Sequence, residues 1–348
     1  MTDLAQVPVL PRVAVSGFDD AWRRWIAENL MLGVAAESLV PKLVEQGLSA
    51  SQAAEEIALA ANSPYLQGAQ RLQNRLKKRE WMLECYSRLH RLLPQGDRVD
   101  VRHRLSRDEF LRDYYTANRP VVITGMIEDW PALQTWTPAS LRERFGSREV
   151  EVQLGRTQNQ SYEAEATKHK QKMPFRQYVE MVVNGGATND YYMTANNSSN
   201  NFAALHELWD DIVQIPEYLD GSSPQKGFFW FGPKGTITPL HHDLTNNFMA
   251  QVYGRKLVRL VPSCDLAHVY NDHHCYSRVD AGHVDPQQLP DFSNCHVIDC
   301  EIGPGEILFL PIGWWHYVVG LEISITMSFT NFVFDNDFYS FYKTYQAC

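Results

Sequence analysis

The chain has 348 residues, of which 44% are hydrophobic, and its formal net charge is -9. This length is sufficient for two domains and a sizeable core, while the acidic balance argues against binding of nucleic acid through its phosphates. No stretch has the roughly 18 consecutive apolar residues that a membrane span needs, and the N-terminus has neither the basic nor the apolar region of a signal peptide.

The six cysteines form no CxxC pair, which in a chain of this length is typical of reduced thiols. We therefore expect a cytoplasmic protein. Neither nucleic acid nor a membrane is expected among its partners.

Residues 1–95 are predicted to be helical. Asp19 or Asp20 can cap the first helix, and Ser49 can cap the third. Pro64 follows Ser63 as the first residue of the longest helix, a position that proline favours. Short connections between the helices predict a small bundle, or a helical extension that packs on the rest of the chain. The helices are expected near residues 21–32, 37–45 (with Pro41 as an alternative first turn), 50–60 and 65–93.

The segment PQGDRVD at residues 94–100 is the predicted domain boundary, so the second domain is expected over residues 96–348. Beyond it, short β-branched or aromatic runs are separated by Gly, Pro and Asn. Many short strands in about 250 residues favour a mainly β fold, either a barrel or a double-sheet jelly roll of the cupin type. The predicted strands are 121–124, 150–154, 228–231, 257–261, 306–309 and 323–329.

Candidate metal ligands lie in the segment GTITPLHHDLTNNFMAQVYGRK, residues 235–256. If a strand ends there, alternation of side chains places His241 and Asp243 on one face and His242 on the other. A third ligand must come from elsewhere, and His316 in LPIGWWHYVVG follows a turn and opens an apolar run that resembles a returning strand. Taken alone, His316 is better explained as a core histidine bonded to a carbonyl.

Two histidines and one carboxylate on one face of a metal ion leave the opposite face open. This arrangement is the facial triad of non-haem iron(II) oxygenases. The open positions are needed because a cosubstrate and O2 must both reach the metal.

The motifs TPLHHD, NNFMAQVYGRKLVRLVPS and GEILFLPIGWWHYVVG, followed by ITMSFTNF, resemble the JmjC/cupin-like 2-oxoglutarate oxygenases. Within them, the chain looks most like asparaginyl hydroxylases of the type that inhibits hypoxia-inducible factor, and their bacterial relatives. The upstream stretch RLSRDEFLRDYYTANRPVVITGMIEDWPALQTW is similar to the start of the same domain. The resemblance covers residues 101–332 and implies a double-stranded β-helix with Fe(II), 2-oxoglutarate and O2 as cofactors.

Carried over by position, the resemblance implies that His241, Asp243 and His316 ligate iron. It implies further that Thr238 and Lys256 hold the distal carboxylate of 2-oxoglutarate. Lys256 lies fifteen residues after His241. The physical reading agrees, because a lysine that points into a barrel needs an anion to offset the cost of burial.

Asn247 and Asn331 are implied as hydrogen-bond donors near the metal-binding end of the cosubstrate. Tyr192 is implied as a further hydroxyl on the distal carboxylate, with Tyr191 as the alternative inward residue. Large apolar side chains are expected to wall the site and keep it dry. The expected wall residues are Phe248, Trp314 and Trp315.

The activity implied is hydroxylation of a C–H bond on a protein or peptide side chain. The alternatives are a free amino acid or natural-product intermediate as substrate, or a cupin-like binding protein with a silent metal pocket. Demethylation of N-methyl-lysine and hydroxylation of RNA also occur among such enzymes, and the acidic balance disfavours RNA. Loops at 157–173, 195–201 and 265–294 are expected to select the substrate. An apolar stripe over 338–345 predicts a short C-terminal helix, which packs on its own chain or adds to a homodimer contact built with the N-terminal helices.

Overall fold

The computed structural model describes residues 19–94, 96–159, 161–193, 199–223, 227–271 and 274–341. The chain forms two compact units. One runs to Tyr86 and includes Asp285–Pro290, and the other comprises Ser87–Val284 and the chain from Asp291 onward. The predicted boundary at residues 94–100 lies a few residues beyond this division, which falls within the fourth helix.

The first unit is helical. Asp19 caps α1, since its carboxylate accepts hydrogen bonds at 3.0 Å from two backbone N–H groups of the first turn. Ser49 caps α3 in the same way. Pro41 lies within α2 instead of opening it, because the helix already begins at Ala36. Trp22, Trp25, Ile26, Leu39, Leu43, Leu48, Ala53 and Ile57 form its core. The helices are α1 (Asp20–Met31), α2 (Ala36–Glu45), α3 (Ala50–Asn62) and α4 (Pro64–Arg91).

The second unit is built on strands. They are β1 (Asp100–His103), β2 (Val121–Thr124), β3 (Glu149–Leu154), β4 (Lys170–Pro174), β5 (Tyr191–Tyr192), β6 (Phe228–Gly232), β7 (Ile237–His242), β8 (Asn247–Tyr253), β9 (Lys256–Val261), β10 (Ile298–Ile302), β11 (Glu306–Leu310), β12 (Trp315–Gly320) and β13 (Ser324–Phe329). Each of the six predicted segments falls on one of these strands, whereas β8 and β10 were not predicted. The helices of this unit are α5 (Arg107–Phe110), which continues into a π-helical turn, α6 (Ala132–Thr135), α7 (Pro138–Phe145), α8 (Ala166–His169), α9 (Phe175–Asn184) and α10 (Ser199–Leu205).

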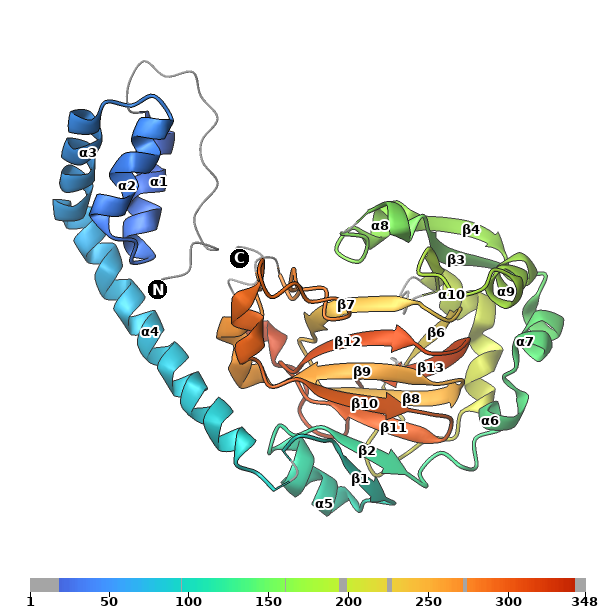
Figure 1. The fold of residues 1–348 in the computed structure, drawn as a ribbon. Coiled ribbons are helices and arrows are strands. Elements are labelled where there is room, and N and C mark those ends of the chain that lie inside the picture. The colour runs from blue at the N-terminus through green and yellow to red at the C-terminus, as the bar shows by residue number, and fades with distance from the viewer. Residues whose placement is uncertain are drawn as a thin grey trace. The chain divides into compact units, whose positions relative to one another are not determined.

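Two sheets form the core of this unit. The larger has the order β1-β2-β11-β8-β13-β6, and the smaller has the order β10-β9-β12-β7. From β6 to β9 and again from β10 to β13, the chain alternates between the two sheets, as a jelly roll requires. Figure 1 shows the four strands of the smaller sheet as one layer that faces the larger sheet. The predicted double-stranded β-helix is therefore confirmed.

Burial follows the strand period. Along β9 the side chains of Lys256, Val258 and Leu260 are buried, whereas those between them are partly exposed. The inward side chains of both sheets share one apolar cluster, to which β9, β10 and β11 contribute. The outer face of the larger sheet is covered by a second cluster that includes side chains of α7 and α9. A small third sheet, ordered β4-β3-β5, contributes β5 beside the core.

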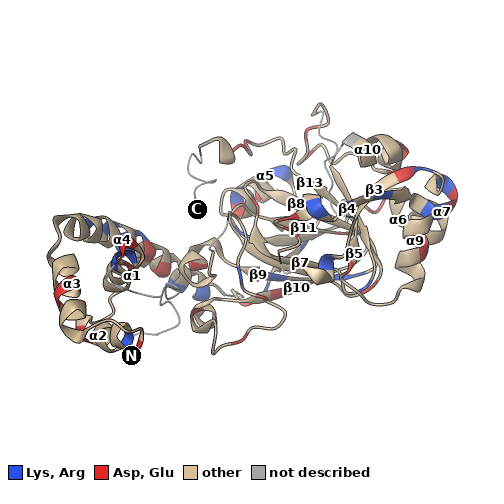
Figure 2. Cartoon of the chain, turned by 90° about the horizontal axis from the view of Figure 1, so that it is seen from above, with Lys and Arg blue, Asp and Glu red and all other residues tan. Residues whose placement is uncertain are grey.

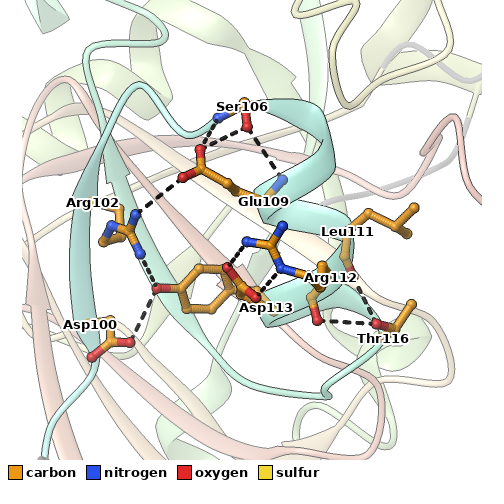
Figure 3. Close-up of polar contacts among 9 residues, drawn as sticks. Asp100, Arg102, Ser106, Glu109, Leu111, Arg112, Asp113 and Thr116 are labelled. Atoms are coloured by element: carbon orange, nitrogen blue, oxygen red, sulfur yellow. Dashed lines mark hydrogen bonds and ion pairs between the residues drawn. The ribbon is translucent and has the colours of Figure 1, made fainter.

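The start of the second unit is held by polar contacts, shown in Figure 3. Ser106 and Glu109 form a reciprocal capping box at the first turn of α5, with a hydroxyl-to-carboxylate distance of 2.7 Å. Arg102 donates to the Tyr114 hydroxyl at 3.1 Å, and that hydroxyl donates to Asp100 at 3.2 Å. The contacts of Tyr114 tie the π-helical turn that follows α5 to β1, which pairs in parallel with β2 at the edge of the larger sheet.

Two expectations for the loops and the C-terminus need correction. Residues 170–174 are not loop but strand β4, which pairs with β3 along its whole length. Its sequence, KQKMP, lacks the apolar alternation that identifies a strand, because three of its five side chains are exposed. In place of the predicted C-terminal helix, the described part of that segment has a single 3-10 turn, Tyr339–Phe341. The rest of it, and most of 195–201, lie outside the described residues.

Candidate metal centre

Three side chains with metal-ligating atoms meet at one end of the smaller sheet. His241 lies on β7, Asp243 follows the end of that strand, and His316 on β12 pairs directly opposite His241. The candidate ligand atoms all lie within 4.8 Å of one another. Nε2 of His241 lies 3.7 Å from Oδ1 of Asp243, and Nε2 of His316 lies 4.0 Å from Oδ2 of the same carboxylate. The structure thus brings the three predicted ligands together.

Hydrogen bonds fix the tautomer of both histidines. Nδ1 of His241 lies 2.8 Å from the carbonyl of Pro239, and Nδ1 of His316 lies 3.0 Å from the carbonyl of Trp314. Since a carbonyl can only accept, each Nδ1 carries the proton and each Nε2 offers its lone pair. The Nδ2 group of Asn247 donates to Asp243 at 3.0 Å. This bond orients the carboxylate.

Burial and mutual charge set the protonation states. Burial lowers the pKa of His241, and neighbouring His316 lowers it further. Burial acts to raise the pKa of Asp243, but His316, His241 and the Asn247 amide outweigh it, so that pKa is lowered. A neutral imidazole beside an ionised carboxylate is the state that binds a divalent metal ion.

A small cavity adjoins the triad and lies between the two sheets. It receives side chains from β5, β6, β7, β8, β9, β12 and β13. Of the residues that the sequence implicates, Thr238, Asn247, Lys256 and Tyr192 line it. Besides these and the triad, the lining includes four residues that the sequence did not point to, which are Trp230, Met249, Val318 and Ser328.

The far wall of this cavity carries a buried lysine. Lys256 is 2% exposed, and its Nζ donates to the hydroxyl oxygen of Tyr192 at 3.1 Å. Tyr192, not Tyr191, is therefore the inward residue, because the Tyr191 hydroxyl donates to the carbonyl of Met181 outside the cavity. Burial lowers the pKa of Lys256 to about 7. No carboxylate pairs with Lys256 among the described residues, so the cavity is chemically suited to an anion.

A β-bulge explains how Thr238 and His241 face the same cavity. Strict alternation would place these side chains, three residues apart, on opposite faces. In the pairing of β7 with β12, however, His316 and Val318 stand opposite His241 and Thr238, so one intervening residue of β12 faces two of β7. The extra residue in β7 rotates Thr238 back toward the cavity.

Asn331 is not brought to the cavity. β13 ends at Phe329, and the Asn331 amide instead donates to the carbonyl of Asp220 at 2.9 Å, in a separate hollow beside Trp130. The three predicted wall residues are buried as expected, but none lines the cavity. Phe248, for example, packs in the outer cluster.

Metal-binding groups elsewhere give no second site within the described residues. The sequence DHHC at 272–275 also groups possible ligands, but Asp272 and His273 lie outside those residues. In the part of the chain that is described, the triad is the single cluster with metal-ligand spacing. None of the described cysteines forms a disulfide.

A model of the cupin-like domain matches residues 107–339 of this chain, which is more than half of its length. The chain belongs to the cupin-like, JmjC-type oxygenase family. Members of this family use Fe(II), 2-oxoglutarate and O2, which confirms the predicted cofactor set. The likeness to an asparaginyl hydroxylase in particular stays a prediction.

Three relatives show the range of the family. The chain is 37% identical to "Lysine-specific demethylase JMJ30" of Arabidopsis thaliana, covering 67% of this chain and 54% of the relative. It is 32% identical to "Lysine-specific demethylase 8" of Xenopus tropicalis, over 64% and 50% of the two chains. It is 26% identical to "tRNA wybutosine-synthesizing protein 5" of Gallus gallus, over 64% and 74%. The chain thus spans about half the length of the first two. Within the described residues, no helix is long and apolar enough to cross a membrane.

The residues present fit the cofactors of the family. Two imidazole Nε2 atoms and a carboxylate oxygen match the donor set that Fe(II) accepts. Beside them, a buried ammonium and a phenolic hydroxyl match one end of a dicarboxylic acid. Because Lys256 donates to the oxygen of Tyr192, the phenolic proton remains available for a ligand carboxylate.

The low pKa of Lys256 predicts a pH dependence of cosubstrate binding. A dianion binds the ammonium form, so 2-oxoglutarate affinity should fall as the pH rises above about 7, with proton uptake on binding. The stability of the ligand-free protein should change in the opposite sense. Between about 7 and 10.5 the unfolded lysine keeps its proton and the folded one loses it, so stability rises with pH in that window. Calorimetric titration in buffers of different ionisation enthalpy measures the proton uptake, and Lys256→Met should remove it.

Proposed function

We propose that this protein is an Fe(II)- and 2-oxoglutarate-dependent dioxygenase that hydroxylates a C–H bond on a protein or peptide side chain. The observation that carries the proposal is the arrangement of His241, Asp243 and His316 beside a cavity that ends in buried Lys256. A silent binding pocket would need neither an open-faced ligand set nor an unpaired lysine, whose burial costs stability.

In this proposal each side chain has one role. His241, Asp243 and His316 hold the metal, and Asn247 keeps the Asp243 carboxylate in place. Lys256, Tyr192 and Thr238 bind the distal carboxylate of 2-oxoglutarate, through the ammonium and the two hydroxyl groups. Bound together, Fe(II), 2-oxoglutarate and O2 supply the oxidising power that inserts one oxygen atom into the substrate, with succinate and CO2 as the other products.

The walls of the cavity protect this chemistry from solvent. Trp230, Met249 and Val318 present apolar surface to the space between the metal ligands and Lys256. Exclusion of water strengthens the contacts of the bound dianion and limits side reactions. Trp230 is itself fixed, because its indole N–H donates to the Ser328 hydroxyl at 2.8 Å.

A polypeptide substrate is favoured over a small molecule for two reasons. The relatives named as lysine-specific demethylases act, by their names, on lysine residues. In addition, the chain has a helical first unit and several polar segments that are not part of the jelly-roll strands. Asp and Glu outnumber Lys and Arg by 41 to 32, so a basic or neutral peptide would be preferred. Figure 2 shows acidic and basic positions interspersed along the described ribbon.

Demethylation of N-methyl-lysine is the second candidate, because two relatives carry that activity in their names. The two candidates share their first step. Hydroxylation of an N-methyl carbon gives a hemiaminal, which breaks down to formaldehyde and the shortened amine. An RNA substrate, suggested by the name of the third relative, is disfavoured by the acidic balance of this chain.

Product analysis should separate these candidates. The iron-loaded protein is incubated with 2-oxoglutarate and three panels: peptides, N-methyl-lysine peptides and free amino acids. We expect peptides that gain one oxygen atom, with stoichiometric succinate. Loss of a CH2 unit with release of formaldehyde would establish demethylation instead. Turnover confined to a free amino acid would contradict the polypeptide assignment.

We propose further that residues 1–95 are a separate helical domain that assists docking of the substrate. A homodimer and a cytoplasmic location also stay predictions.

A further inference from the structure

A second buried cation lies next to the cosubstrate cavity. Arg156 follows Gly155 at the end of β3, and its side chain is fully buried. Its guanidinium carbon lies 4.4 Å from the ring centre of Tyr162 and 5.1 Å from that of Tyr192. The guanidinium thus contacts both a residue of the 156–163 segment and a residue of the cavity wall.

The same guanidinium holds the start of β7. Its Nη2 group donates at 2.6 Å to the carbonyl of Ile237, which also accepts the Tyr162 hydroxyl at 3.2 Å. Ile237 directly precedes Thr238, a residue that lines the cavity. Arg156 therefore contacts the ring of Tyr192 and the backbone next to Thr238, although it does not itself line the cavity.

Stability alone does not account for an arginine at this place. Its Nε and Nη1 groups have no hydrogen-bond partner among the described residues. Glu163, the nearest carboxylate, lies 3.8 Å from Nη2 and is itself 11% exposed. A buried cation that has unpaired donors and a carboxylate no closer than this lowers the free energy of unfolding. Apolar residues of similar volume often replace such a charge without loss of stability.

The structure assigns to Arg156 the role of a positioning residue for the cosubstrate: it orients the Tyr192 ring toward Lys256 and fixes Thr238, and so sets the affinity and chain-length selectivity for a dicarboxylic 2-oxo acid. This inference rests on the proposed function. It concerns an arginine that touches neither the metal ligands nor the cavity.

The test compares Arg156→Met with a matched control. Arg148→Met removes a guanidinium that also donates to a backbone carbonyl, pairs with a glutamate and lies over an aromatic ring, Phe145, but does not touch Tyr192 or β7. Each full-length variant is loaded with Mn(II) and titrated calorimetrically with 2-oxoglutarate and with the longer 2-oxoadipate. Mn(II) affinity and the melting temperature are measured in parallel.

For Arg156→Met we expect 2-oxoglutarate affinity to fall about tenfold, which corresponds to about 1.4 kcal/mol. The ratio of its affinity for 2-oxoglutarate to its affinity for 2-oxoadipate should decrease. Its affinity for Mn(II) should stay unchanged. Arg156→Lys, which keeps the charge but not the planar group, should be intermediate. Arg148→Met should leave both 2-oxo acids unaffected.

Arg156→Met alone leaves Glu163 buried beside no cation, which can destabilise the fold. The double variant Arg156→Met/Glu163→Gln removes both charges and keeps the test decisive. Equal affinity for 2-oxoglutarate in a folded double variant would overturn the inference and leave the proposed function intact. Failure of the unsubstituted protein to bind 2-oxoglutarate would instead overturn the proposed function.

Discussion

Replacing His241 or Asp243 with alanine is expected to abolish substrate-dependent succinate release. Each substitution leaves two of three candidate ligands, and Asp243→Ala also removes the only carboxylate of the set. Loss of an anionic ligand should weaken metal binding as well as catalysis. Succinate release and metal content after dialysis are the two measurements.

His242 provides the control for this prediction. It is the neighbouring histidine on β7, but its ring packs edge-on against Trp315, with ring centres 4.8 Å apart, and does not line the cavity. His242→Asn should therefore keep one metal ion per chain and retain turnover. Full activity in His241→Ala or Asp243→Ala would show that the metal-ligand assignment is incorrect.

Replacing Lys256 with alanine is expected to weaken 2-oxoglutarate binding roughly 30-fold or more. Loss of a charge-assisted contact in a desolvated pocket costs about 2–5 kcal/mol. Metal affinity should hardly change, because Lys256 contacts Tyr192 and none of the metal ligands.

Lys256→Met should raise the melting temperature of the ligand-free protein. The substitution removes a buried ammonium group that is not paired with a carboxylate among the described residues.

Arg259 supplies the matched control on the same strand. It lies on the opposite face of β9 and pairs with Asp299 at 2.7 Å. Arg259→Met should leave 2-oxoglutarate affinity unchanged. An unaltered affinity in Lys256→Ala, measured by calorimetric titration, would mean that the lysine does not bind the cosubstrate.

Two of the three predicted ligands could be identified because their signal is local, whereas His316 depended on the family resemblance. His241 and Asp243 are two residues apart, so a strand of any register places them on one face. Lys256 begins a strand whose alternation shows which side chains are buried. The caps at Asp19 and Ser49 are local for the same reason, since each bonds to a backbone N–H no more than three residues away.

The rest of the site depends on which strands meet across the jelly roll. Trp230 and Ser328 share a hydrogen bond although 98 residues separate them in the chain. No local pattern identifies either as a cavity residue. Asn331 shows the opposite failure. The family resemblance implied a role for Asn331 in the site, but the strand ends before it and its amide donates to the carbonyl of Asp220.

The bulge in β7 also limits how this segment can change in length. Thr238 and His241 reach the same cavity only because the two residues between them include the extra residue of the bulge. Pro239 and Leu240 do not line the cavity, so their side chains are free of direct contact with a ligand. Insertion or deletion of one residue there would rotate Thr238 or His241 away, whereas many substitutions would leave both in place. The number of residues in this short stretch is thus more tightly constrained than their identity.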